Sequence, residues 1–204
     1  LIYTSGTTST PKGVPISHYS CDFSTKNIAK TNQKNQPVTS NQISNMANIH
    51  QSLIEAKESE DLIYFVEDDY IHSKNAINEM ILTFERISSQ TKGDLFLCPI
   101  DYPYLYSKAE PTQVFLGDNH HWRKINETLC TFLTSKKIVD RHWNILKSMC
   151  EIEHYPFEKP LHNIYEKELC ISPIPSLAIH CTNVNSIFGL SPNVDWKKLW
   201  DENK

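Results

Sequence analysis

Three consecutive carboxylates, Glu67, Asp68 and Asp69, directly follow the apolar, β-rich run 62–66. Like charges this close repel one another and resist removal from water, and a divalent cation relieves the repulsion. Mg²⁺ and Mn²⁺ prefer oxygen ligands and bridge protein carboxylates to phosphates. Because ligands of open α/β sheets bind at the carboxyl ends of strands, the triplet is placed to hold a nucleotide diphosphate. The alternative is that these acids cap the next helix and stabilise the positive, N-terminal end of its dipole.

His180 is the second residue whose position suggests chemistry. It ends the apolar run 175–180, which is typical of a short strand. An imidazole can complete an oxygen-rich metal site. Taken alone, such a histidine can equally be a core or surface residue with ordinary hydrogen bonds.

The elements that would position these groups follow from the spacing of apolar residues. Period-3.6 patterns predict helices and short β-rich runs predict strands, and Ser73 is expected to cap the second helix. The predicted helices are 41–57, the segment from 73 to about 92, 136–149, 160–167 and 196–200, and the predicted strands are 62–66, 95–98, 112–116, 128–134 and 176–180. Strands interleaved with helices predict an α/β layered domain.

Composition excludes several classes of protein. The chain has 204 residues, of which 39% are hydrophobic and 22% charged, a mix typical of a globular domain. A net charge of −4 gives no basic excess for nucleic acid, and no apolar run is long enough to form a transmembrane segment. Six cysteines without a C-x-x-C pair predict reduced thiols and a cytoplasmic protein, and the first residue, Leu1, predicts a fragment. Oligomeric state stays open.

An ordered set of segments resembles a family of bacterial glycosyltransferase-like proteins with a GT-A-type nucleotide-sugar domain. The matching segments are 64–72, 121–123, 131–132, 172–177 with His180, and 190–196, so the resemblance covers about 41–200. It implies that 41–204 is a catalytic region with a partial GT-A-like, Rossmann-like mixed sheet and flanking helices. It also implies a metal-dependent glycosyltransferase that moves a sugar from a nucleotide-sugar donor to a glycan or polysaccharide acceptor.

The resemblance also assigns roles around the donor. Enzymes of this fold hold a metal, here Mn²⁺ or Mg²⁺, with an acidic motif at the end of a central strand and a late histidine. The corresponding ligands are Glu67, Asp69 and His180, with Asp69 the principal one. Asp68 and Arg123 are expected to contact the donor, the arginine by pairing with a phosphate.

The acceptor side of the predicted site is less specific. An inverting enzyme needs a carboxylate base, and Glu158 fits best, with Glu127 and Asp101 as rivals. Each of these acids can instead be a solvated surface residue. Aromatic faces suit the C–H surfaces of sugars, so a sugar platform is predicted at Tyr102, Tyr104 and Trp122. The simpler role for such rings is packing in the core or in a loop.

A second motif begins the chain. Residues 1–14 resemble the phosphate-binding loop of adenylate-forming enzymes, with Ser9 where that family usually has glycine. The ATP-loop-like residues are Thr4, Ser5, Gly6, Thr7, Thr8 and Lys12. This motif covers 1–18, and the polar stretch 19–40 is expected to be a linker. The alternative function is thus a fragment of an adenylate-forming ligase or acyl-CoA synthetase.

The first forty residues conflict with a complete GT-A domain. Such a domain begins with a βαβ half that binds the nucleoside, and these residues are not expected to supply its strands. We therefore expect a loosely packed N-terminal arm and a missing nucleoside-binding half. A third function stays open, a non-catalytic α/β domain that binds a sugar nucleotide or a partner.

Overall fold

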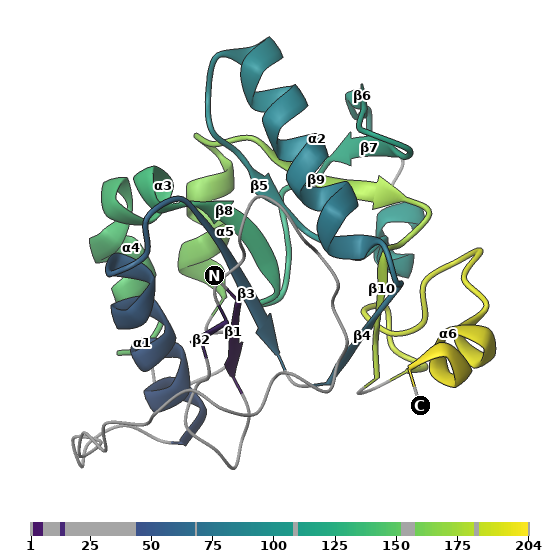
Figure 1. Cartoon of the computed structure of the whole chain (residues 1–204), viewed down its shortest axis with the longest axis horizontal. Helices are drawn as coiled ribbons and strands as arrows, with labels where there is room; N and C mark the ends of the chain where they lie inside the picture. Colours follow the sequence, from purple (N-terminus) through teal and green to yellow (C-terminus); the bar gives the residue numbers. More distant parts are fainter. Residues whose placement is uncertain are drawn as a thin grey trace. The chain divides into compact units, whose positions relative to one another are not determined.

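A computed structural model describes residues 2–5, 13–14, 44–67, 69–107, 110–151, 158–181 and 184–203 (Figure 1). The chain forms two compact units, each built from two stretches of sequence. The first unit contains 1–68 and 127–167, and the second unit contains 69–126 and 168–204. Both units combine helices with parallel and antiparallel strand pairs, so the predicted α/β class is confirmed. The predicted linker 19–40 lies outside the described residues.

Four strands of the first unit pair in the order β2-β1-β3-β8. They are β1 (Ile2–Ser5), β2 (Gly13–Val14), β3 (Leu62–Glu67) and β8 (Phe132–Ser135). β1 is parallel to β3, and the other two pairings are antiparallel. The first forty residues thus contain two short strands, and the expectation that they do not supply the strands of a nucleoside-binding βαβ half stays a prediction. Ile2, Tyr3 and Thr4 are residue types that favour strands, but β1 is only four residues long and enters a Ser/Thr/Gly-rich stretch that is typical of a loop.

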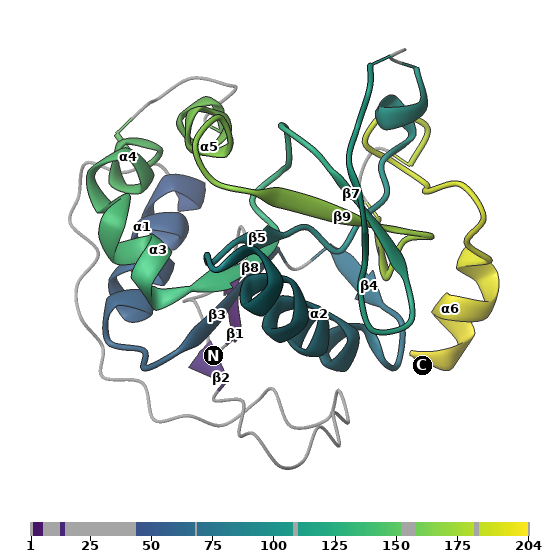
Figure 2. The ribbon, with the colours of Figure 1, turned by 90° about the horizontal axis from the view of Figure 1, so that it is seen from above.

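The helices of the first unit are α1 (Ser44–Lys57), α3 (Lys136–Arg141), α4 (Trp143–Ser148) and α5 (Lys159–Tyr165). α1, α3 and α4 contact one another beside the strands (Figure 2). The Ser135 hydroxyl caps α3 by accepting from the Ile138 N–H. The single helix predicted for 136–149 is divided at His142, which ends α3 and precedes α4.

The second unit contains the strands β5 (Phe96–Leu97), β9 (Cys170–Ile174), β7 (His121–Lys124) and β6 (Val114–Leu116), paired in that order. A separate antiparallel pair joins β4 (Tyr70–His72) to β10 (Ala178–His180). β4, β7 and β9 were not predicted. β9 contains Pro173, which argues against a strand in sequence, and β4 and β7 are too short and polar to stand out.

Helix α2 (Ala76–Thr91) covers one face of the larger strand group of the second unit (Figures 1 and 2). Its buried face includes Met80, Phe84 and Ile87, as the apolar spacing predicts. Ser73 is not its cap: the N-cap is Asn75, and the Ser73 N–H donates to the Leu177 carbonyl at 2.8 Å.

The 3₁₀ turn η2 (Pro103–Tyr106) follows β5, and helix α6 (Trp196–Glu202) comes near the end of the chain. α6 contacts β4. Among the residues that the structure describes, no helix combines the length and apolar character needed to cross a membrane.

Candidate functional site

Asp69 and His180 meet in the second unit, although they lie far apart in sequence. Asp69 immediately precedes β4, His180 ends β10, and the antiparallel register sets His180 opposite Tyr70. The Nε2 atom of His180 lies 2.9 Å from Oδ2 of Asp69. The backbone reinforces this arrangement, because the Cys181 N–H donates to the Asp69 carbonyl at 2.8 Å. Two of the three predicted metal ligands are thus neighbours.

The second ring nitrogen of His180 restricts its chemistry. Nδ1 lies 3.1 Å from the Phe188 carbonyl oxygen, which can only accept a hydrogen bond, so Nδ1 carries a proton. Nε2 faces a carboxylate, which at neutral pH also accepts only. The imidazole therefore either carries a second proton and pairs with Asp69, or is neutral with its Nε2 lone pair available to a cation. The Asp69 side chain is 29% exposed and that of His180 only 10%, so solvent reaches the pair from the side of the aspartate.

The other two residues of the acidic triplet are not part of this pair as the structure describes it. Glu67 is the last residue of β3 in the first unit, is half-buried, and donates its N–H to the Thr131 hydroxyl at 3.1 Å. Asp68 lies outside the described residues. Within the described ranges, no group of three or more His, Cys, Asp or Glu side chains is arranged to hold a metal. Glu67 as a ligand and Asp68 as a donor contact remain predictions.

Asp101 and Arg123 form an ion pair inside the second unit. Nη2 of Arg123 contacts Oδ1 of Asp101, and the Tyr106 hydroxyl donates to Oδ2. The guanidinium also lies over the Tyr106 ring, 4.2 Å from its centroid. Burial and the Asp101 carboxylate raise the pKa of Tyr106 to about 12, which keeps its hydroxyl protonated as a donor. A phosphate contact by Arg123, or base catalysis by Asp101, would have to compete with this pairing.

Glu158 lies directly before α5 in the first unit and is buried. Burial raises the pKa of its carboxyl above the ordinary value, and nearby His162 opposes that rise. Burial also raises the pKa of the Cys130 thiol, with smaller contributions from the Glu67 and Glu158 carboxylates. A raised pKa suits a group that exchanges protons near neutral pH. Glu127, the rival base in the same unit, is half-buried.

The predicted sugar platform is wrong for all three of its residues. Tyr102 and Trp122 are fully buried and Tyr104 is 4% exposed. Tyr102 shares a hydrogen bond with the Tyr70 hydroxyl at 3.0 Å, and the Trp122 indole N–H donates to Glu79 at 3.4 Å. Large rings gain most from leaving water when their polar atoms find partners inside, so these rings stabilise the core.

Glu79 organises a buried network that the sequence gave little reason to expect. From α2, its carboxylate accepts hydrogen bonds from the backbone N–H groups of Asn119 and His120 as well as from Trp122. Burial alone would raise the pKa of Glu79, but these donors and the His120 charge lower it below its ordinary value. A glutamate next to apolar Met80 on a predicted helix face was the available signal. The network fixes the turn between β6 and β7 to helix α2, which is a structural role.

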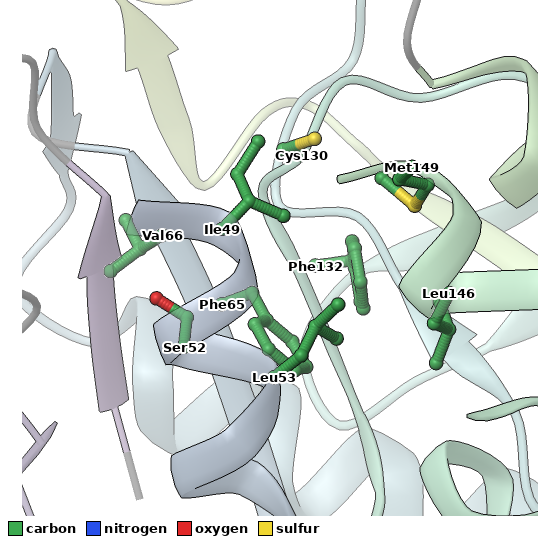
Figure 3. Close-up of a pocket in the computed structure, with 9 residues that line it drawn as sticks. All are labelled: Ile49, Ser52, Leu53, Phe65, Val66, Cys130, Phe132, Leu146 and Met149. Carbon is green, nitrogen blue, oxygen red and sulfur yellow. The ribbon is translucent and has the colours of Figure 1, made fainter. Parts of the chain in front are cut away.

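A small apolar cavity of about 20 Å³ lies in the first unit (Figure 3). Its lining includes no charged side chain, and its volume suits about one water molecule. The lining residues are Ile49, Ser52, Leu53, Phe65, Val66, Cys130, Phe132, Leu146 and Met149. A nucleotide or sugar has no place there.

The ATP-loop-like residues are only partly described. Thr4 and Ser5 belong to β1, whereas Gly6, Thr7, Thr8 and Lys12 lie outside the described residues. β1 and β2 pair antiparallel on either side of 6–12, and β1 runs parallel to β3 with Ser5 in register with Glu67.

Comparisons with known proteins add no relative: no family model matches the chain, and no curated protein matches it significantly. The two family resemblances therefore rest on the motifs of this sequence.

Proposed function

We propose that the chain is a metal-dependent glycosyltransferase that moves a sugar from a nucleotide-diphosphate donor to a glycan acceptor, with Asp69 and His180 holding Mn²⁺ or Mg²⁺. The observation that carries the proposal is the 2.9 Å approach of His180 Nε2 to Asp69 Oδ2. The motif resemblance pairs these two positions, which are 111 residues apart in sequence and lie at the same end of the paired strands β4 and β10.

The atoms of this pair fit a divalent cation. Ligands at neighbouring corners of an octahedral shell, with bonds of about 2.1 Å, lie about 3 Å apart. The Phe188 carbonyl holds Nδ1 in the protonated form, which directs the Nε2 lone pair toward Asp69. Such an outer hydrogen bond is the usual partner of a metal-binding histidine. When bound, the cation would stabilise the negative charge of the departing diphosphate.

The base of the proposed reaction is Glu158, with Glu127 and Asp101 as alternatives. Its burial and raised pKa support this choice, because a base must hold a proton readily near the working pH. Arg123 is less suited to the donor, since Asp101 and Tyr106 already engage it.

Calorimetry of UDP and GDP binding with and without Mn²⁺ tests the proposal. The wild type should bind a nucleoside diphosphate only with the metal, and Asp69→Asn should lose that binding. Glu85→Gln, which neutralises an exposed carboxylate on α2, is the matched control and should bind as the wild type does. Equal diphosphate binding by Asp69→Asn, or binding that needs no metal, would overturn the proposal.

A specific observation also favours the adenylate-forming alternative. β1 and β2 are paired strands that flank residues 6–12, the arrangement in which a phosphate-binding loop could be supported. ATP titration of the wild type and of Lys12→Ala tests this reading. ATP binding that depends on Lys12, without Mn²⁺-dependent binding of UDP or GDP, would favour it over the transferase. If the wild type binds none of ATP, UDP and GDP, the result would favour a non-catalytic partner-binding domain.

A further inference from the structure

Helix α6 exposes two large aromatic side chains on one face. Trp196 is 43% exposed and Trp200 is 51% exposed. Residues four positions apart in a helix lie one above the other, so the two indoles are neighbours on the surface. Leu199 is buried, which fixes α6 against the second unit. Two exposed tryptophans on an anchored helix are costly to leave in water and point to a ligand.

The charges around the indoles narrow the class of ligand. Within α6 two basic residues are balanced by two acidic ones, Lys197 and Lys198 against Asp201 and Glu202. An anionic membrane surface attracts helices with an excess of Lys and Arg, which α6 lacks. Lys197 and Asp201 directly follow the two tryptophans in sequence and place a donor and an acceptor beside the rings, and Lys197 Nζ lies 5.6 Å from the Trp196 ring centroid. Lys198 and Glu202 lie on the other side of α6, 3.8 Å apart. Aromatic faces with a polar rim of both kinds fit a neutral ligand rich in hydroxyl groups.

The position of α6 connects it to the candidate metal pair. α6 contacts β4, the strand that begins directly after Asp69 (Figures 1 and 2). Asn203, the C-cap of α6, donates to the carbonyl of His72 in β4 at 3.1 Å. The segment leading to α6 also supplies the Phe188 carbonyl that contacts His180. The aromatic face and the Asp69–His180 pair are thus held by the same few elements of the second unit.

We propose that Trp196 and Trp200 form the platform on which the carbohydrate acceptor binds. One face of a pyranose ring carries C–H groups, which are attracted to the negative face of an indole, while the hydroxyl groups at its edge reach the polar rim. This inference rests on the proposed transferase function and adds the location of its acceptor. It replaces the platform expected at Tyr102, Tyr104 and Trp122, whose rings are inside the core.

Binding of maltohexaose, cellohexaose and chitohexaose to the full chain tests the inference, measured by saturation-transfer NMR and tryptophan fluorescence. At least one hexasaccharide should bind the wild type, and Trp200→Ala should weaken that binding about tenfold or more. Trp200→Phe keeps an aromatic face and should recover part of the affinity. Leu116→Ala changes an equally exposed apolar residue on β6 and should have no effect.

Asp69→Asn separates this inference from the transferase proposal. It should lose Mn²⁺-dependent UDP or GDP binding while keeping hexasaccharide binding, whereas Trp200→Ala should show the reverse. Unchanged hexasaccharide binding by Trp200→Ala would overturn the platform and leave the metal pair intact. Failure of all three hexasaccharides to bind would overturn it as well. A change in sedimentation of Trp200→Ala without any sugar binding would instead identify a contact between copies of the chain.

Discussion

Two aspartates of the second unit each face a nitrogen group, and their surroundings differ in a way that separates structure from chemistry. Asp101 is 1% exposed, and Arg123 and Tyr106 both bond to its carboxylate. Asp69 is 29% exposed and faces an imidazole, whose charge depends on its protonation. Asp101 instead faces a guanidinium that always carries its charge and is buried with it, and we call such a buried, fully paired carboxylate a closed pair. In the second pair only the aspartate is partly exposed, and in the proposed function a metal ion replaces the proton between the two groups. The two aspartates thus differ in their exposure to solvent and in whether the partner is a guanidinium or an imidazole. These differences, more than the carboxylate itself, decide which aspartate is suited to bind a ligand.

Arg123→Met should have the largest effect on stability. It would leave the Asp101 carboxylate buried without its cation, which typically costs about 3–5 kcal/mol. Urea unfolding followed by circular dichroism measures the change. Lys136→Met is the matched control, because the ion pair of Lys136 with Asp140 is half-exposed and should be worth about 0.3–0.5 kcal/mol. A loss below about 1 kcal/mol for Arg123→Met would show that the first pair is not closed.

Tyr106→Phe sharpens the description of the closed pair. It removes the hydroxyl that donates to Asp101 but keeps the ring that lies over Arg123. Hydrogen bonds to charged groups contribute about 1.5–3 kcal/mol, and the 53% exposure of Tyr106 places the expected loss nearer about 1–2 kcal/mol. Urea unfolding of the single and double variants measures it. The loss should shrink in an Arg123→Met background, and an unchanged loss there would mean that the three groups do not act together.

Glu158 extends the comparison to a buried carboxylate in the first unit. Its folded-state pKa lies above the ordinary value of 4.5 because of burial. The protonated form is therefore favoured by folding, and the stability it contributes is present below pH 4.5 and is lost as pH rises through the folded-state pKa. Glu158→Gln cannot ionise and should lose less stability between pH 4 and pH 7. Unfolding curves at several pH values measure the difference, and parallel pH profiles for wild type and variant would contradict the predicted direction.

Local periodicity was enough to predict the elements that bury a continuous apolar face. β3 and α2 were found from the run 62–66 and from the spacing of Met80, Phe84 and Ile87. β9 was missed because Pro173 weakens the strand pattern, and the break at His142 was missed because apolar residues continue through it. Both features depend on neighbours in space, which a local pattern does not report.

The candidate site could be predicted only in part for a related reason. Residue types and strand ends indicated Asp69 and His180, but their 2.9 Å approach comes from the β4–β10 pairing, and β4 itself was not predicted. Aromatic residues give the opposite lesson. An aromatic ring has the same letter whether it is buried or exposed, so the sequence could not distinguish the core ring of Trp122 from the surface ring of Trp200.

Asp69→Asn should have the smallest effect on stability and thereby gives the sharpest contrast with Arg123→Met. With Nδ1 protonated toward the Phe188 carbonyl, the asparagine amide can donate to the Nε2 lone pair of His180, so both ring nitrogens keep a partner. We expect the free energy of unfolding without metal to change by less than about 1 kcal/mol. Added Mn²⁺ should raise the melting temperature of the wild type, because a ligand that binds only the folded state stabilises it, and should leave Asp69→Asn unchanged. Thermal unfolding with and without Mn²⁺, and with EDTA to remove the metal, measures both effects. A large loss of stability in the variant without metal would mean that Asp69–His180 is a closed structural ion pair like Asp101–Arg123, and the distinction between the two aspartates would fail.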